Sequence, residues 1–235
     1  APDIAPFSVA SWLAASEAAR QIDLSHPMQK GMPIHPAHPP FHITLNNRHG
    51  DVLRCCGHSS SNELMVTSTH SSTHIDALCH VSDHGELFGK FQATEVQAGT
   101  DLFKVHGAET IAPIFRRGVL LDVALVRGGE PLDSPRYLGL NSAGAPGPGV
   151  AAGHWLAARK PFSVGSDTSA FEVMNHHNIT LEVHLILIAQ NGIHIIENLD
   201  LEELAAAEPG PFAFVALPVR ISGATGSPVR PLALI

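Results

Sequence analysis

Short apolar runs, separated by residues that favour turns, make up much of the chain. Five of these runs are rich in β-branched residues and are bounded by Gly, Pro, Asn or Asp, which is the pattern of short strands. We expect strands at residues 42–47, 62–70, 118–125, 179–190 and 212–221.

Segments with helical spacing of apolar residues lie before and between these runs. The segment 8–20 has Ser8 or Ser11 as its candidate N-cap. The segment 199–207 contains Asp200 and Glu203 at the spacing of a capping box. The proline-rich segment 22–41 is excluded from regular helix and is expected to be a loop that covers a site. The loose alternation of helices and strands predicts a mixed α/β domain. The expected helices are residues 8–20, 100–115, 147–160, 168–177 and 199–207.

Residues 70–80, HSSTHIDALCH, place His70, His74, Asp76 and His80 within eleven positions. Polar side chains so close together repel or titrate one another unless they share a partner, and a cation is the simplest such partner. If the segment is extended, all four side chains point to one face. If it is helical, the pairs spaced four apart are still neighbours. Both geometries predict a tight polar cluster, with Cys79 as a packed thiol on the opposite face of an extended segment.

Two imidazoles and one carboxylate leave coordination positions open, which is typical of a catalytic metal site. The nitrogen and oxygen donors suit Zn, Mn or Fe(II). The alternative is that some of the 16 histidines fall together by chance and make ordinary hydrogen bonds. A second group consists of His184, which lies in an apolar run, and Glu197, which follows a second apolar run. If these side chains are buried they need polar partners, and residues 70–80 could provide them.

The composition favours a single domain over residues 1–235 that associates with itself. Hydrophobic residues make up 44% and charged residues only 15% of the chain, against roughly 25% charged in typical soluble domains. Such sparse charge favours burial of surface in a homodimer or a higher homo-oligomer. The net charge of -8 and the absence of a basic run argue against a nucleic-acid partner.

Other classes of protein are disfavoured by missing motifs. The glycines of residues 144–153 follow no strand and are interrupted by prolines, so they do not form a dinucleotide-binding loop, and no G-x-S-x-G elbow of a serine hydrolase occurs. No apolar run is long enough to span a membrane, and the first residues lack the pattern of a signal peptide. Three cysteines without a CxxC motif fit a reducing compartment. We therefore expect a cytoplasmic protein without a membrane partner.

The segment 70–80 resembles the signature H-x-G-T-H-x-D-x-P-x-H of the metal-dependent cyclase family, which includes isatin hydrolases and bacterial kynurenine formamidases. The chain departs from the signature at Ser72, where the family has Gly, and at Leu78, where it has Pro. Further matches extend the resemblance over almost the whole chain. They are DLSHPMQKGMPIHP, GVLLDVA, FSVGSDTSAFE, GIHIIENLDLEEL and FVALPVRISGATGSPVRPLA.

The resemblance implies roles for the residues of the two groups. His70, His74 and Asp76 would hold a divalent metal, Mn or Zn, with one ion and in some members a second. His80 would act as a ligand or as an acid and base. His184 and Glu197 would complete the site, either with a second metal or by handling protons. The implied fold is a curved mixed β-sheet or barrel-like core flanked by helices, assembled as a homodimer or larger.

The implied activity is hydrolysis of a cyclic amide of a small aromatic substrate, isatin to isatinate, by metal-activated water. An aromatic ring needs an apolar pocket, for which Phe41 and Trp155 are the candidate walls. The motif does not separate this reaction from arylformamidase activity on N-formylkynurenine or from hydrolysis of related cyclic amides and lactones. Two further alternatives are an inactive metal-binding scaffold and an Fe(II) oxygenase that uses two histidines and a carboxylate.

Overall fold

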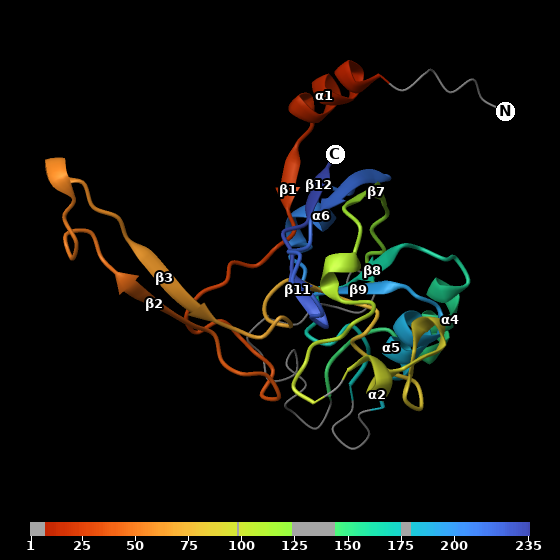
Figure 1. The fold of residues 1–235 in the computed structure, drawn as a ribbon. Helices are drawn as coiled ribbons and strands as arrows, with labels where there is room; N and C mark the ends of the chain where they lie inside the picture. The colour runs from red at the N-terminus through yellow and green to blue at the C-terminus, as the bar shows by residue number, and fades with distance from the viewer. Residues whose placement is uncertain (1–7, 98, 124–143, 175–179) are drawn as a thin grey trace.

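Two four-stranded sheets form the centre of the computed structural model, which describes residues 8–97, 99–123, 144–174 and 180–235 (Figure 1). The first sheet is antiparallel with the strand order β1-β12-β10-β7, and the second has the order β11-β4-β9-β8, with β8 and β9 parallel. The strands of the first sheet are β1 (Gln21–Asp23), β7 (Ile114–Gly118), β10 (Phe212–Ala216) and β12 (Leu232–Leu234). Those of the second are β4 (His74–Asp76), β8 (Ser163–Gly165), β9 (His194–Glu197) and β11 (Gly226–Pro228).

Two small sheets and several short helices complete the described chain. The small sheets are the hairpin of β2 (His42–Asn47) with β3 (Asn62–Val66) and the pair of β5 (Glu86–Leu87) with β6 (Phe91–Gln92). The α-helices are α1 (Val9–Ala18), α2 (Ala93–Val96), α4 (Val150–Ala157), α5 (Glu182–His184) and α6 (Glu202–Ala206). The 3-10 turns are η1 (Cys55–Gly57), η2 (Phe88–Lys90) and η3 (Ala108–Thr110), and the π-helical turn η4 (Leu185–Gln190) continues α5.

Strand β9 lies between two apolar layers, because its side chains alternate between the two faces of the second sheet. Ile196 packs in the core that the two four-stranded sheets share, whereas Ile195 packs against the helical layer of α4, α5 and η4. Glu197 has the same parity as Ile195 and therefore also faces the helical layer. This arrangement brings a carboxylate of β9 toward α5.

Residues 179–190 were expected to form a strand, and this expectation is wrong: residues 182–190 form α5 and η4. The run is apolar on nearly all sides, and Val183, Ile186, Leu187 and Ile188 are buried. A continuous apolar run fits a buried helix as well as a buried strand, so its periodicity does not decide between them. The correction places His184 on a helix that packs over the second sheet.

Three other expectations differ from the structure. Residues 100–115 form only the short turn η3 and the start of β7, because Phe103 and Ala108 donate their backbone N–H groups to Gly223 and Ala224 instead of to their own segment. Of the strand expected at 118–125, residues 119–123 form no strand, because β7 ends at Gly118, which pairs with Phe212, the first residue of β10. Residues 124–125 lie outside the described residues.

The helix expected over residues 168–177 is absent from its described part, where Phe171 has a positive φ and Met174 bridges to Ala145; residues 175–177 lie outside the described residues. The mixed α/β class, the helices expected within 8–20, 147–160 and 199–207 and the strand at 42–47 are confirmed. The strands expected at 62–70 and 212–221 are present but shorter, because β3 ends at Val66 and β10 at Ala216. The sheets are open, so the described chain forms no closed barrel. No helix within the described ranges is long and apolar enough to cross a membrane.

Candidate metal centre

The candidate metal centre lies between the second sheet and α5. β4 pairs with β9 in a register that sets His74 opposite Glu197 and Ile75 opposite Ile196. Residues opposite each other in an antiparallel pair share a face, so His74 joins Glu197 on the side of the helical layer while the two isoleucines point into the shared core. Asp76, two residues after His74, has the same parity and points to the same side.

His70 precedes β4 and closes one side of the cluster. Its Nδ1 lies 2.9 Å from Asp76 Oδ1, and its Nε2 lies 2.9 Å from the Thr225 hydroxyl. The ring stacks on that of His80 with 4.1 Å between the centroids. A Cβ at Gly226 would come within 2.6 Å of the His70 ring, so β11 needs glycine at this position.

His74 presents a nitrogen lone pair to the cluster. Its Nδ1 lies 2.9 Å from the Ser72 carbonyl, which can only accept, so Nδ1 carries the proton. Nε2 faces Glu197 Oε2 at 3.4 Å and Asp76 Oδ1 at 3.7 Å. Burial lowers the pKa of His74, but these two carboxylates reverse the effect and the net pKa is raised. Acceptors that face one another in this way need a cation between them, either a proton or a metal ion.

Ser72 shapes the turn before β4. Its φ is 55°, in the left-handed region that favours glycine, and the signature carries Gly at this position. Here the Ser72 hydroxyl donates to the His26 carbonyl at 2.9 Å and holds the turn without glycine. Leu78, at the second departure from the signature, packs against the helical core. Both departures therefore leave the cluster intact.

His184 reaches the cluster from α5 and is oriented by Glu172. Its Nδ1 lies 2.5 Å from Glu172 Oε2, and the same carboxylate accepts the backbone N–H groups of Val183 and His184. His184 Nε2 lies 3.2 Å from Glu197 Oε1 and 3.7 Å from Asp76 Oδ2. Burial opposes the charged imidazole, but Glu172 and Glu197 outweigh it and raise the pKa of His184 to about 10. A carboxylate bonded to the far nitrogen of a histidine is the usual second partner of a metal ligand.

Asp76 is the centre of the cluster. Both of its carboxylate oxygens are buried, and neither makes a hydrogen bond of acceptable geometry in the described chain. Burial would raise the pKa of Asp76, but the surrounding imidazoles, that of His80 foremost, hold it well below its usual range. A buried, ionised carboxylate without hydrogen bonds is costly unless a cation neutralises it.

Two overlapping sets of ligand atoms fit a divalent ion, and both include Asp76. His70 and His74 complete one set, and His80 and His184 complete the other, with all ligand atoms of each set within 4.8 Å of one another. The nitrogen and oxygen donors are those that first-row metals accept. The residues present therefore fit a metal ion.

His80 has a different electrostatic character from His184. Burial is the main cause that lowers the pKa of His80, to about 4, and the nearby rings of His70 and His184 lower it further, while Asp76 opposes them. His80 is therefore a neutral imidazole at pH 7, with a lone pair available to accept a proton or a metal ion.

The sequence-predicted residues divide into two groups. Six of them form the cluster: His70, His74, Asp76, His80, His184 and Glu197. Phe41 is buried before the start of β2, and Trp155 lies half exposed on α4 with the Arg159 guanidinium 3.4 Å over its ring. Their roles as pocket walls remain predictions. Cys79 is a packed thiol, because burial raises its pKa to about 12.

Three contributors were missed by sequence reasoning: Glu172, His194 and Thr225. Glu172 lies within the segment FSVGSDTSAFE, whose acidic end was an available signal. His194 Nδ1 lies 2.8 Å from the Asp76 carbonyl and helps to position the ligand strand. Nothing local marks Thr225, because its contact with His70 spans 155 residues.

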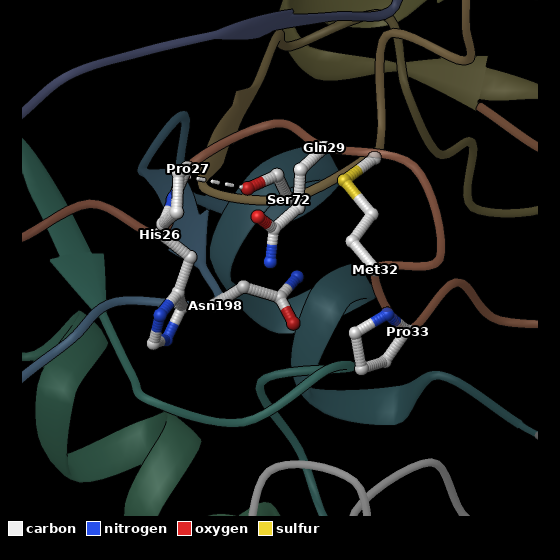
Figure 2. Close-up of a pocket in the computed structure, with 7 residues that line it drawn as sticks. All are labelled: His26, Pro27, Gln29, Met32, Pro33, Ser72 and Asn198. Atoms are coloured by element: carbon white, nitrogen blue, oxygen red, sulfur yellow. Dashed lines mark hydrogen bonds between the residues drawn. The ribbon is translucent and has the colours of Figure 1, made fainter. Parts of the chain in front are cut away.

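A small pocket lies between the proline-rich segment, Ser72 and Asn198 (Figure 2). Its volume is about 160 Å³, and its walls are His26, Pro27, Gln29, Met32, Pro33, Ser72 and Asn198. The proline-rich segment forms most of these walls, as expected of a loop that covers a site. The Thr73 hydroxyl ties the parts together, since it accepts the His26 N–H at 2.9 Å and donates to the Asn198 carbonyl at 2.5 Å. Two of its walls, Ser72 and Asn198, are close in sequence to the cluster residues His74 and Glu197.

One family of known proteins matches the part of the chain that carries residues 70–80. The family described as "Putative cyclase" matches residues 22–173, a range that includes the whole segment 70–80. The chain belongs to this cyclase family. No curated protein sequence matches it.

Solved structures of cyclase-family type share the fold. A structure described as a novel cyclase superposes with a TM-score of 0.78 at 20% identity, covering 99% of this chain and 92% of the other. Isatin hydrolase A from Ralstonia solanacearum has a TM-score of 0.70 at 20% identity with full coverage of both chains. A predicted metal-dependent hydrolase from Bacillus stearothermophilus has a TM-score of 0.58 at 20% identity, covering 92% of this chain and 98% of the other. These three proteins therefore share the fold of this chain.

Metal binding is expected to release protons. With its pKa raised to about 10, His184 of the metal-free chain carries a proton on each nitrogen at pH 7, and Nε2 must lose its proton for an ion to occupy the set of Asp76, His80 and His184. The apparent affinity for Mn²⁺ or Zn²⁺ should therefore rise with pH, by up to about tenfold per unit for each proton released. Titration calorimetry in buffers of different ionisation enthalpy measures the number of protons. Binding without proton release in wild type, or unchanged release in His184→Asn, would contradict this role.

Proposed function

We propose that this chain is a metal-dependent hydrolase that opens the cyclic amide of a small aromatic substrate, with isatin as the first candidate. The observation that carries the proposal is the Asp76 carboxylate, buried and lacking hydrogen bonds, between two pairs of imidazoles. Membership of the cyclase family supports it, and the fold is shared with proteins named isatin hydrolase and metal-dependent hydrolase.

We infer a divalent cofactor, Mn or Zn, held by His70, His74 and Asp76. Such an ion, when bound, lowers the pKa of a coordinated water and polarises a carbonyl oxygen. His80 and His184 share Asp76 with this set, so a second ion is an option that the geometry allows. Metal content measured per chain distinguishes one ion from two.

The chain's own residues supply the proton transfers. His80 is neutral at pH 7, so its ring nitrogen accepts a proton from the attacking water and returns it to the departing amide nitrogen. Glu197 stays ionised although it is buried, because His184 and His74 hold its pKa below the ordinary value. Its carboxylate fixes the two imidazoles and is the second candidate, after His80, for the proton transfer. Ring opening of isatin then yields isatinate.

His80→Ala is expected to retain metal and to lose turnover, because removal of a general acid and base costs about 10²- to 10⁴-fold in rate. Metal content and kcat on isatin are the two measurements. His84→Ala is the matched control, since His84 lies four residues further on with a fully exposed side chain. A metal-free His80→Ala protein would reassign His80 as a ligand, and wild-type turnover would remove it from the mechanism.

The choice of substrate is tested by kcat/KM measured side by side on isatin and N-formylkynurenine. Faster turnover of isatin supports the proposed reaction. Faster turnover of N-formylkynurenine would make the protein an arylformamidase with the same metal chemistry. If neither compound reacts while metal is bound, the proposed substrate is wrong and other cyclic amides and lactones are to be tried.

A further inference from the structure

The metal centre needs a route by which an ion arrives, because its candidate ligands are buried. The side chains of Asp76 and His74 are exposed by only 1% and 2%, whereas that of His70 is exposed by 9%. An entry path is one of the features that a proposed metal site must have. His70, the most exposed of the three, therefore marks the side from which an ion reaches the set.

Two further histidines continue the cluster outward from His70. The His38 ring lies against the His70 ring, with 5.8 Å between the centroids and 15° between the planes. The His35 ring follows, with 6.1 Å between its centroid and that of His38. Both outer residues are partly exposed. A continuous row of imidazoles therefore runs from the proline-rich loop to the buried carboxylate of Asp76.

The backbone of the proline-rich loop holds the two outer rings in place. Residues 35–38, HPAH, form a β-turn, which the His38 N–H closes by donating to the His35 carbonyl at 2.9 Å. Proline is favoured at the second position of such a turn, because its ring fixes φ. The Ala37 N–H donates to His35 Nδ1 at 3.2 Å and orients that ring. The turn thus keeps the two imidazoles side by side.

The spacing of the rings suits an ion that passes from one ring to the next. Metal–nitrogen bonds of about 2.1 Å hold two imidazoles that share an ion with their centroids roughly 4.5–6.5 Å apart. The distances from His35 to His38 and from His38 to His70 both lie in this range. The ring nitrogens of His38 make no hydrogen bond with the described residues, so a lone pair is open to an ion.

The inner end of the row binds an ion more strongly than the outer end. Among the described residues, His35 and His38 belong to no set of three ligand atoms, whereas His70 belongs to a set that includes Asp76. A buried carboxylate attracts a cation far more strongly than it would in water, because the interior screens the charges less. An ion held by the outer pair alone is therefore drawn toward His70.

We propose that His38, with His35 beside it, is an entry site that takes a divalent ion from solvent and delivers it to His70. His38 contacts the ion only in transit and is not a ligand of the bound state. The loss of such a residue slows association and dissociation by the same factor and leaves their ratio, the Kd, unchanged. The proposal rests on the metal centre proposed above and not on the choice of substrate.

Stopped-flow uptake of Zn²⁺ by the metal-free chain tests the entry site, with a zinc-sensitive dye that reports free Zn²⁺. His38→Phe keeps an aromatic ring against His70 but has no ligand nitrogen. Its association is expected to be at least about tenfold slower, the lower end of the gain that local concentration of ions gives. Release of Zn²⁺ to excess chelator should slow by the same factor. His38→Ala is expected to behave like His38→Phe, because both lack the nitrogen.

His42→Phe is the matched control, since His42 lies four residues further along the chain and is exposed. Both of its rates should equal those of wild type. Wild-type rates in the two His38 variants overturn the entry site alone. A higher Kd at the wild-type association rate also overturns it, because His38 would then stabilise the bound ion. A wild-type chain that takes up no Zn²⁺ contradicts the metal centre, and the entry site with it.

Discussion

Asp76→Asn is expected to abolish catalysis and to weaken binding of Mn²⁺ or Zn²⁺ by more than about 100-fold, since loss of a mere orienting partner already costs about 10- to 100-fold. Asp76 is shared by both sets of candidate ligands, so no alternative set of three survives the change. The amide has nearly the shape of the carboxylate but lacks its charge. Calorimetric titration of the chelated protein measures the affinity.

Asp83→Asn is the control for this prediction. Asp83 lies seven residues further along, near the surface, where it pairs with His84 and Gln190. The same chemical change there should leave metal affinity and turnover near wild type. If Asp76→Asn binds the ion as tightly as wild type, the metal centre is misassigned.

Glu172→Ala is expected to destabilise the metal-free protein by about 3–5 kcal/mol, the usual cost of breaking a buried charged pair. Glu172 is buried, and its carboxylate bonds the His184 ring and two backbone N–H groups of α5. The variant leaves the His184 imidazolium and these donors without that partner. Urea unfolding of the chelated protein measures the loss.

The same variant is expected to bind metal about 10- to 100-fold more weakly, because His184 loses the group that orients it. Glu182→Ala is the control: Glu182 is exposed in the first turn of α5, where a carboxylate contributes at most about 1 kcal/mol through the helix dipole. Equal stability of the Glu172 and Glu182 variants would mean that Glu172 does not hold His184 in place.

The candidate ligand residues in and around β4 could be predicted from sequence because their chemistry is local. His70, His74, Asp76 and His80 lie within eleven positions, and a shared cation follows from their charges and spacing. Ser72 adopts the left-handed backbone expected where the signature carries glycine. These features need no knowledge of distant contacts.

The orienting residues could not be predicted in this way, because long-range contacts define them. His184 was expected on a strand, yet its apolar segment packs as a helix, and only that packing brings it within reach of Glu172 and Asp76. Residues 100–115 have helical spacing, but their backbone bonds to residues 223–224. Tertiary packing decides the structure of the first segment, and tertiary hydrogen bonds decide that of the second.

The metal content of the purified chain, determined beside its turnover of isatin, decides whether the chain is a metal-dependent hydrolase. We expect one or two equivalents of Mn or Zn per chain after loading, removal of the ion by a chelator, loss of turnover with it, and recovery when the ion is restored. A wild-type chain that binds neither ion, or turnover that survives complete removal of metal, would contradict this assignment.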